Sequence, residues 1–302
     1  MSEQVTLTRK NGTRFTLTLL QHERADAPAI LIQPAMGVQA GYYSLLAEAL
    51  HAAGCHVGVS ELRGHEAAED AKRPGWDYDF SYHDMLHEDW PLAVQAMQAR
   101  FPASKFYLLG HSLGGQISNL YASTQPAKLD GLIIIAACSV YWKLWGFPFL
   151  LYSQVAGQIG RLLGYFPGKH FRFAGREARG VMRDWARQAR TGRFMLGQPR
   201  VDYEPKLAEV TLPVLAISLQ GDFFAPRHTM DALIGKMSKA ALTRIHLDPK
   251  GLGFEKINHF RWVRQPALVM PEVTKWMRRL EVNIHQEGTS GDSAPFGSFN
   301  VE

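Results

Sequence analysis

The segment KFYLLGHSLGGQISNLY, residues 105–121, places a serine between two glycines where one hydrophobic pattern gives way to another. Before the first glycine the chain reads Phe-Tyr-Leu-Leu, a short apolar run typical of a buried strand. After the second, Ile117, Leu120 and Tyr121 recur at the i, i+3, i+4 spacing of a helix. The sequence therefore predicts a strand that turns directly into a helix, with Ser112 on the turn.

The glycines on either side of Ser112 explain how so sharp a turn can form. A strand and a helix joined in this way bring their backbones close together, and side chains at Gly110 and Gly114 would collide. The serine is then held in a sparsely populated backbone conformation, with its hydroxyl above the edge of the sheet. The G-x-S-x-G pattern alone arises by chance in roughly one chain in ten. The strand and the helix around it make the turn a nucleophile elbow.

Length and composition indicate ordinary globular material. The chain has 302 residues, of which 46% are hydrophobic and 20% charged, enough for one large α/β domain with an insertion or for two domains. Its formal net charge of +5 is modest and no nucleic-acid-binding motif accompanies it, so we expect no nucleic-acid partner. We see no secretory signal, and the uninterrupted apolar runs stop near about ten residues. We therefore expect a soluble, cytoplasmic protein.

Strand and helix patterns alternate along most of the chain. An Asn-Gly pair at residues 11–12, between two alternating runs, predicts an antiparallel hairpin at the N-terminus. Further strand patterns begin near residues 29, 55, 105, 129, 213 and 241. Helical patterns separate most of these strands, so we predict an α/β protein whose mostly parallel sheet is covered on both faces.

The alternation breaks between residues 140 and 210, which divides the chain into four segments. We predict that residues 1–139 and 211–282 form the two parts of the α/β core. Residues 140–210 would be a helical cap inserted between two strands, and residues 283–302 a tail. Within the tail, the low hydrophobicity of residues 287–298 predicts a flexible segment or an extended chain docked on the core.

A serine nucleophile needs a base within hydrogen-bond reach and an acid that orients the base. In the order serine, acid, histidine, Asp222 follows the strand that ends near residue 220, and His259 lies after the last strand. The ends of parallel strands would bring both to the same sheet edge as Ser112. Asp231 and Asp248 are the rivals of Asp222 as the acid.

An acyl-transfer site also needs two backbone N–H donors for the negative charge that develops on the carbonyl oxygen. The residue after the nucleophile, Leu113, supplies one of them. Met36, in the loop QPAMGVQAGYY, is our candidate for the second, with a merely packed methionine as the alternative reading.

We expect neither a metal ion nor a cofactor. His83 and His87 stand four residues apart, close to Asp84, Glu88 and Asp89, and could share one helix face. Two histidines are too few ligands to define a site, so we interpret this stretch as a solvated polar face.

The predicted cap carries two further patterns. Tyr141, Trp142 and Trp145 belong to a run rich in aromatic residues, which could line an acyl pocket or bury the cap against the sheet. Residues 176–190 predict one amphipathic helix whose arginines share a face: Arg176, Arg179, Arg183, Arg187 and Arg190. A solvated basic face is the plain interpretation. Attraction of an anionic substrate or of acidic lipid is the alternative.

From about Ala27 to Leu280 the chain resembles a little-characterised bacterial group of predicted α/β-hydrolases of the serine hydrolase type. The motifs that carry the resemblance are PAMG (34–37), ELRGH (61–65), GHSLGGQ (110–116), YW (141–142), GYFPGK (164–169), DFFAP (222–226) and NHF (258–260). The resemblance implies the α/β-hydrolase fold, with a triad of Ser112, Asp222 and His259 and oxyanion donors at Met36 and Leu113. Two features depart from it: Glu61 replaces the usual aspartate, and the usual His-Gly motif near Met36 is absent.

One fold hosts many activities, so the substrate has to be argued from the site. A serine nucleophile argues against a dehalogenase and favours acyl transfer through a serine ester. We predict a carboxylic ester hydrolase acting on a small acyl ester or thioester. Thioester hydrolysis or acyl transfer on the same triad, and a catalytically silent binding module, are the alternatives.

Overall fold

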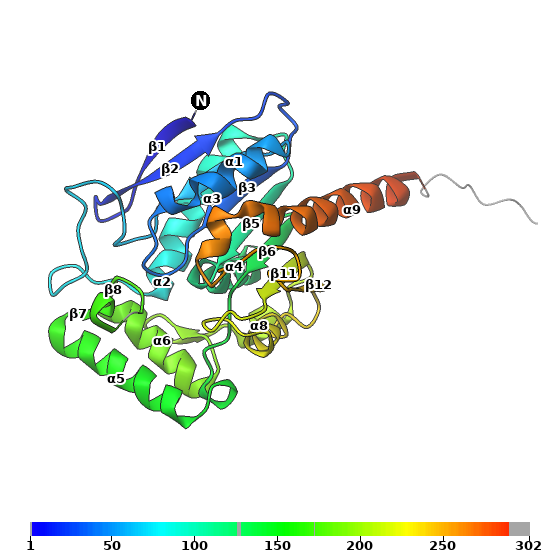
Figure 1. Cartoon of the computed structure of the whole chain (residues 1–302). Coiled ribbons are helices and arrows are strands. Elements are labelled where there is room, and N and C mark those ends of the chain that lie inside the picture. The colour runs from blue at the N-terminus through cyan, green and yellow to red at the C-terminus, as the bar shows by residue number, and fades with distance from the viewer. Residues whose placement is uncertain (1, 126–127, 172, 290–302) are drawn as a thin grey trace, which may run out of the picture.

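The computed structural model describes residues 2–125, 128–171 and 173–289, and its centre is an eight-stranded sheet (Figure 1). The strands lie in the order β1 (Ser2–Thr8), β2 (Arg14–Leu20), β4 (His56–Ser60), β3 (Ala29–Gln33), β5 (Phe106–His111), β6 (Gly131–Ile135), β11 (Pro213–Leu219) and β12 (Ala241–Leu247). Strand β2 pairs antiparallel with β1 and β4, whereas the other neighbours are parallel. The predicted hairpin and mostly parallel sheet are confirmed.

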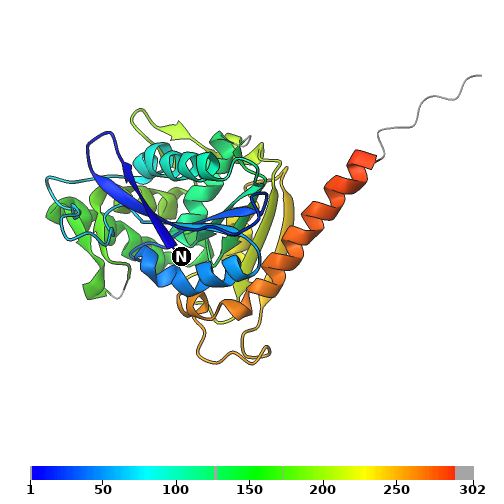
Figure 2. The same cartoon turned by 90° about the horizontal axis from the view of Figure 1, so that it is seen from above.

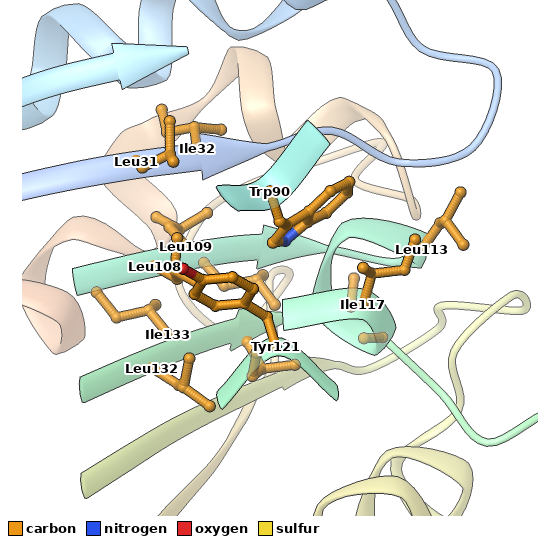
Figure 3. Close-up of a cluster of buried hydrophobic side chains, with 14 of the residues drawn as sticks. Leu31, Ile32, Trp90, Leu108, Leu109, Leu113, Ile117, Tyr121, Leu132 and Ile133 are labelled. Atoms are coloured by element: carbon orange, nitrogen blue, oxygen red, sulfur yellow. The ribbon is translucent and has the colours of Figure 1, made fainter. Parts of the chain in front are cut away.

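Helices cover both faces of this sheet. Figure 2 shows α1 (Ser44–Ala52) and α9 (Met270–Thr289) on one face and α3 (Trp90–Arg100) on the other. All residues of β3, β4, β5 and β6 are buried, as their continuous apolar runs require. In Figure 3, side chains of these strands pack against those of α4 (Leu113–Thr124). Helix α8 (Arg227–Ile234) packs on β11.

Residues 140–210 lie between β6 and β11 and contain strands as well as helices. Their elements are α5 (Phe147–Leu163), β7 (Tyr165–Pro167), β8 (Arg176–Ala178), α6 (Arg179–Thr191), β9 (Met195–Leu196), β10 (Val201–Asp202) and α7 (Glu204–Ala208). Short ladders join β7 to β8 and β9 to β10. Helices α5 and α6 pack on each other at one edge of the molecule, with α5 outermost (Figure 1). We call residues 140–210 the inserted segment.

Two helical regions differ from what their sequence patterns suggest. The helical region between β4 and β5 is not one uniform α-helix but is divided into α2 (Tyr82–Asp84), a π-helical stretch (Met85–Asp89) and α3. Arg176 lies on β8 rather than on the arginine helix, because Ala178 is extended and α6 begins only at Arg179.

The C-terminal tail also differs from the prediction. Helix α9 continues to Thr289, past the predicted start of the tail at residue 283. Residues 290–302, which include most of the stretch expected to be flexible, lie outside the described residues. Among the described residues, no helix is both long and apolar enough to cross a membrane.

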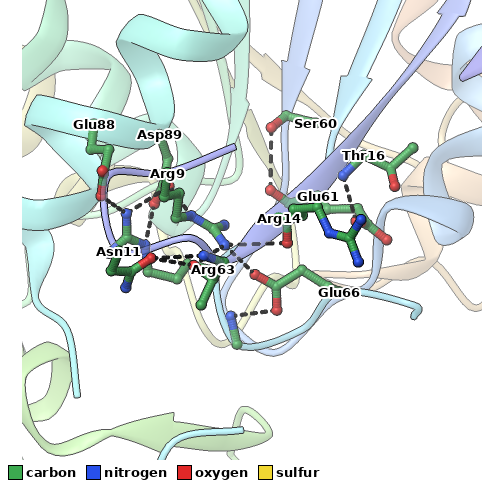
Figure 4. A network of polar contacts seen from close by, with 12 residues as sticks. Arg9, Asn11, Arg14, Thr16, Ser60, Glu61, Arg63, Glu66, Glu88 and Asp89 are labelled. Atoms are coloured by element: carbon green, nitrogen blue, oxygen red, sulfur yellow. Dashed lines mark hydrogen bonds and ion pairs between the residues drawn. The ribbon is translucent and has the colours of Figure 1, made fainter. Parts of the chain in front are cut away.

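The stretch expected as a solvated polar face instead contributes to a buried ion network (Figure 4). Asp89 Oδ1 lies 2.5 Å from Arg9 Nε, and its Oδ2 lies 2.8 Å from Arg63 Nε. Arg9 Nη1 also lies 2.9 Å from Glu66 Oε1. These four side chains are buried, and they join the N-terminal hairpin to the loop after β4 and to the residue before α3. The interpretation as a solvated face was therefore wrong for Asp89.

Glu61, the residue that replaces the usual aspartate, has a bridging role beside this network. Its Oε2 accepts a hydrogen bond from the Thr16 backbone N–H and its Oε1 accepts one from the Ala67 backbone N–H, each at 2.7 Å. The carboxylate thus ties β2 to the loop after β4.

Candidate active site

Ser112 lies between β5 and α4 with φ +53° and ψ −115°, in the left-handed region that side chains rarely adopt. A Cβ on Gly110 would lie 2.5 Å from the Gly115 Cα, so this glycine permits the close contact of strand and helix. A Cβ on Gly114 would lie 2.2 Å from the carbonyl oxygen of Gln33. The second glycine therefore brings α4 against the end of β3, and with it the loop that carries Met36.

Asp222 and His259 come together from the loops after β11 and β12. His259 Nδ1 lies 2.9 Å from Asp222 Oδ2 and 3.1 Å from Oδ1, and both side chains are buried. Asp222 Oδ1 also accepts hydrogen bonds from the backbone N–H groups of Phe224 (2.9 Å) and Ala225 (3.1 Å). Because Nδ1 donates to this fixed carboxylate, Nε2 is the nitrogen of His259 that can accept a proton.

The two rival acids have other partners. Asp231 pairs with Arg227 and Arg244 at 3.7 and 3.6 Å, near the surface. Asp248 Oδ1 accepts a hydrogen bond from the Lys250 backbone N–H in a turn. Of the three candidates, the structure joins only Asp222 to His259.

Ser112 and His259 line one cavity of about 620 Å³, together with Met36 and Leu113. No hydrogen bond joins the Ser112 hydroxyl to the His259 ring, although both residues lie within the described part of the chain. In catalytic sites without substrate such bonds are often long. Leu113 is the first residue of α4, so its N–H has no acceptor inside the helix and can serve a ligand.

The walls of this cavity are mostly aromatic. Of the three residues predicted to contact substrate, Trp145 lines the cavity, whereas Tyr141 and Trp142 do not. Tyr141 instead packs over Gly192 at the end of α6. The other aromatic residues in the wall are Tyr82, Phe149, Tyr152, Phe171, Phe173, Trp185, Phe223, Phe224 and Phe260. Phe223, Phe224 and Phe260 lie within two residues of Asp222 or His259, so the sequence alone could have placed them at the site.

Sequence reasoning missed a hydrogen-bonded chain behind the site. The Ala35 N–H donates to Tyr43 Oη at 2.8 Å, and Tyr43 Oη lies 2.8 Å from His111 Nδ1. His111 Nε2 lies 2.9 Å from the His259 carbonyl oxygen, so the proton resides on Nε2 and the Tyr43 hydroxyl donates to Nδ1. Burial, together with His259 nearby, holds the pKa of His111 well below its ordinary value. A neutral imidazole thus connects the Met36 loop to the His259 loop.

The inserted segment packs directly against the loop that carries Met36. Gly37 has φ +76°, and a Cβ there would lie 2.5 Å from the Gly175 backbone nitrogen. Next to this contact, His65 Nε2 lies 3.0 Å from Oε1 of the buried Glu177. Glu177 Oε1 also accepts a hydrogen bond from the Gly175 N–H at 2.9 Å. A buried ion pair therefore fixes the inserted segment beside the site.

The amino-acid sequence matches a known protein family. Residues 25–197 match the family model described as serine aminopeptidase, S33. A stretch of 107 residues is 30% identical to monoglyceride lipase from Rattus norvegicus. This stretch covers 35% of this chain and 34% of the relative. The matched stretch thus spans about a third of that relative's length.

Solved structures resemble the chain over nearly its whole length. A thermophilic esterase from Thermogutta terrifontis superimposes with a TM-score of 0.61 at 17% identity, covering 92% of this chain and 99% of that one. A thioesterase domain from the curacin biosynthetic pathway gives a TM-score of 0.57 at 14% identity, covering 91% and 99%. At such identities the likeness shows the fold alone. Because the family model covers more than half of the sequence, the chain belongs to the serine aminopeptidase S33 family, and the solved structures show that it has the α/β-hydrolase fold.

Proposed function

We propose that the protein is a carboxylic ester hydrolase that works through an acyl-enzyme on Ser112. The observation that carries the proposal is the buried Asp222–His259 pair, which shares an apolar cavity with a serine held at φ +53°. A strained serine, a histidine with one free nitrogen and a fixed carboxylate are the three groups that serine hydrolysis requires.

In the proposed mechanism, Ser112 Oγ attacks the ester carbonyl while His259 Nε2 takes up its proton. Asp222 keeps Nδ1 protonated and stabilises the imidazolium that forms. The backbone N–H groups of Leu113 and Met36 donate to the oxyanion. His259 then protonates the departing alcohol, and a water molecule, activated by the same histidine, hydrolyses the acyl-enzyme.

The lining of the cavity favours an ester of an apolar acyl group over a peptide with a free N-terminus. An aminopeptidase has to neutralise the ammonium group of its substrate, which is done by carboxylates or an equivalent acceptor set. Among the described residues that line the cavity there is no aspartate or glutamate. Its wall offers mainly aromatic surface, with a polar spot where Tyr82 Oη donates to Gln116 Oε1 at 3.0 Å.

We further propose that residues 140–210 act as a cap on a core formed by residues 1–139 and 211–282. The inserted segment contributes Trp145, Phe149, Tyr152 and Trp185 to the cavity wall, and these residues would enclose the acyl chain. The partial likeness to a monoglyceride lipase supports a monoacyl ester as substrate.

The proposal is tested with a fluorophosphonate probe and a panel of matched acyl esters, acyl thioesters and aminoacyl anilides. We expect Ser112→Ala to abolish both labelling and ester turnover, whereas Ser123→Ala, a change at the far end of α4, leaves both intact. Equal labelling of the Ser112→Ala variant would place the nucleophile elsewhere. Faster turnover of thioesters would favour the thioesterase alternative, and an unreactive wild-type protein would favour a binding module.

A further inference from the structure

Helix α5 exposes an apolar stripe along its outer face. Phe147, Leu151 and Leu162 are 65%, 59% and 73% exposed, and Val155 between them is 48% exposed. At 100° per residue these positions fall within one narrow arc. The buried positions of α5, Ser153, Ala156 and Gly160, lie on the opposite side. Single exposed apolar residues are common on proteins, but a contiguous row of them marks an interaction surface.

An arginine-rich groove of about 750 Å³ runs beside this stripe, between α5 and α6. Within the described chain, two carboxylates pair with the arginines of this groove: Asp79 lies 2.9 Å from Arg179, and the buried Asp184 lies 3.0 Å from Arg187 and 3.4 Å from Arg183. The groove is lined by Arg161, Arg179, Arg183, Arg187, Arg190 and Arg200. For Arg161, Arg190 and Arg200, no carboxylate of the described chain lies within 4.0 Å. The groove is therefore strongly positive.

The apolar stripe separates the arginine groove from the active-site cavity. On one flank of α5, Gln154, Gln158 and Arg161 line the groove, and on the other flank Pro148 and Tyr152 line the cavity. Exposed aromatic residues extend the stripe at both sides: Trp76 lines the groove with 61% of its surface exposed, and Phe223 lines the cavity with 80% exposed. Figure 1 shows α5 as the outermost element of this edge of the molecule.

We propose that the outer face of α5 and the arginine groove together dock on the surface of an anionic lipid bilayer. The apolar stripe would enter the boundary between headgroups and acyl chains, while the guanidinium groups bind lipid phosphates bidentately. Tryptophan at such a boundary keeps its ring in the apolar layer and its N–H in the polar one. Docking in this way brings the mouth of the cavity to the membrane.

The shape of the surface favours a bilayer over a protein partner. Helix α5 has 17 residues and forms a projecting ridge about 25 Å long. A projecting ridge of apolar side chains fits a soft lipid surface, whereas a protein partner would need a matching groove. This proposal does not depend on the proposed esterase activity, because it uses no residue of the triad.

The test is co-sedimentation of the full chain with vesicles of phosphatidylcholine, either alone or with about a third phosphatidylglycerol. We expect binding to the anionic vesicles only, with most of it lost at high salt. Leu151→Gln/Leu162→Gln and Arg161→Gln/Arg200→Gln should each weaken the partition coefficient about tenfold. Arg14→Gln/Leu252→Gln, the same types of change at exposed sites away from α5, should bind like the wild type.

The Tm and the turnover of a soluble short-chain ester should stay unchanged in all these variants, and an unchanged Tm separates loss of docking from loss of folding even if the protein has no esterase activity. The proposal is overturned if the wild type does not bind anionic vesicles or binds neutral vesicles equally well. It is also overturned if the stripe variant Leu151→Gln/Leu162→Gln and the groove variant Arg161→Gln/Arg200→Gln both bind like the wild type. Sedimentation velocity tests the competing occupant: a dimer that dissociates in Leu151→Gln/Leu162→Gln, without vesicle binding, would assign the stripe to a second copy of the chain.

Discussion

At the scale of single residues, Tyr43 allows a test of the hydrogen-bonded chain that joins the Met36 loop to the His259 loop. Tyr43→Phe leaves the Ala35 N–H and His111 Nδ1 buried without their shared partner, which should cost about 1–3 kcal/mol in the free energy of unfolding. The value of kcat should fall several-fold while KM changes little, because Tyr43 does not line the cavity. Denaturant titration and ester kinetics measure the two effects.

Tyr121 supplies the matched control. Its side chain is equally buried in the core of Figure 3, but its hydroxyl has no hydrogen-bond partner within the described chain. Tyr121→Phe should therefore leave stability unchanged or raise it slightly, with kcat unaffected. If both variants behave alike, the chain through His111 has no role in positioning the site.

The residues of the candidate site and those behind it show what the sequence could predict at the scale of single residues. Ser112 was found because its glycines and its flanking patterns are local, and Asp222 and His259 because they follow the ends of predicted strands. Their roles remain predictions, although the structure brings the acid and the histidine together. The contact between Tyr43 and His111 was not predicted, because the two residues lie 68 positions apart in sequence and no local pattern near either one indicates it.

At the scale of elements, the ion pair between His65 and Glu177 should make the attachment of the inserted segment depend on pH. Burial alone would lower the pKa of His65, but the negative charge of Glu177, with Glu66 behind it, outweighs burial and the nearby Arg73 and raises the pKa. A raised pKa in the folded state stabilises fully below the unfolded value of about 6.5. That contribution is lost as the pH rises through the folded pKa.

We therefore expect the difference in Tm between the wild type and His65→Gln to be larger at pH 6 than at pH 8, because the contribution falls as the pH rises through the raised pKa of His65. His228→Gln is the control, because the His228 ring contacts the neutral carbonyl oxygen of Leu144. Its effect on Tm should not vary with pH in this way. A His65→Gln difference that is the same at both pH values would show that the pair adds no charge-dependent stability.

Elements were predictable where a pattern was long enough to be periodic. The N-terminal hairpin and the buried strands of the sheet could be predicted, because their alternating or continuously apolar patterns span five residues or more. The short strands β7 and β8, three residues each, could not be. Such strands depend on their pairing partner, so Arg176 was assigned to a helix that begins only three residues later.

At the scale of the whole molecule, the buried ion network decides how the N-terminal hairpin is held. Sequence reasoning treated Asp89 and its neighbours as a solvated face, since charge alone does not reveal that partners arrive from two distant segments. Arg9 is 2% exposed and contacts both Asp89 and Glu66. Arg9→Met fills the space with an apolar chain but removes the cation 2.9 Å from the buried Glu66, which keeps only Arg73 at 4.0 Å. Loss of one partner from a buried ion pair destabilises by about 3–5 kcal/mol.

Urea unfolding of Arg9→Met should therefore show a loss of that size, with the N-terminal hairpin detaching first in hydrogen exchange. Arg14→Met is the matched control: its guanidinium lies 3.6 Å from Asp70, and both side chains are exposed. Exposed pairs contribute only about 0–1 kcal/mol, so this variant should unfold close to the wild type. Equal midpoints for the two variants would mean that Arg63 alone holds Asp89 in place and that the hairpin is attached by its strand pairing to β4.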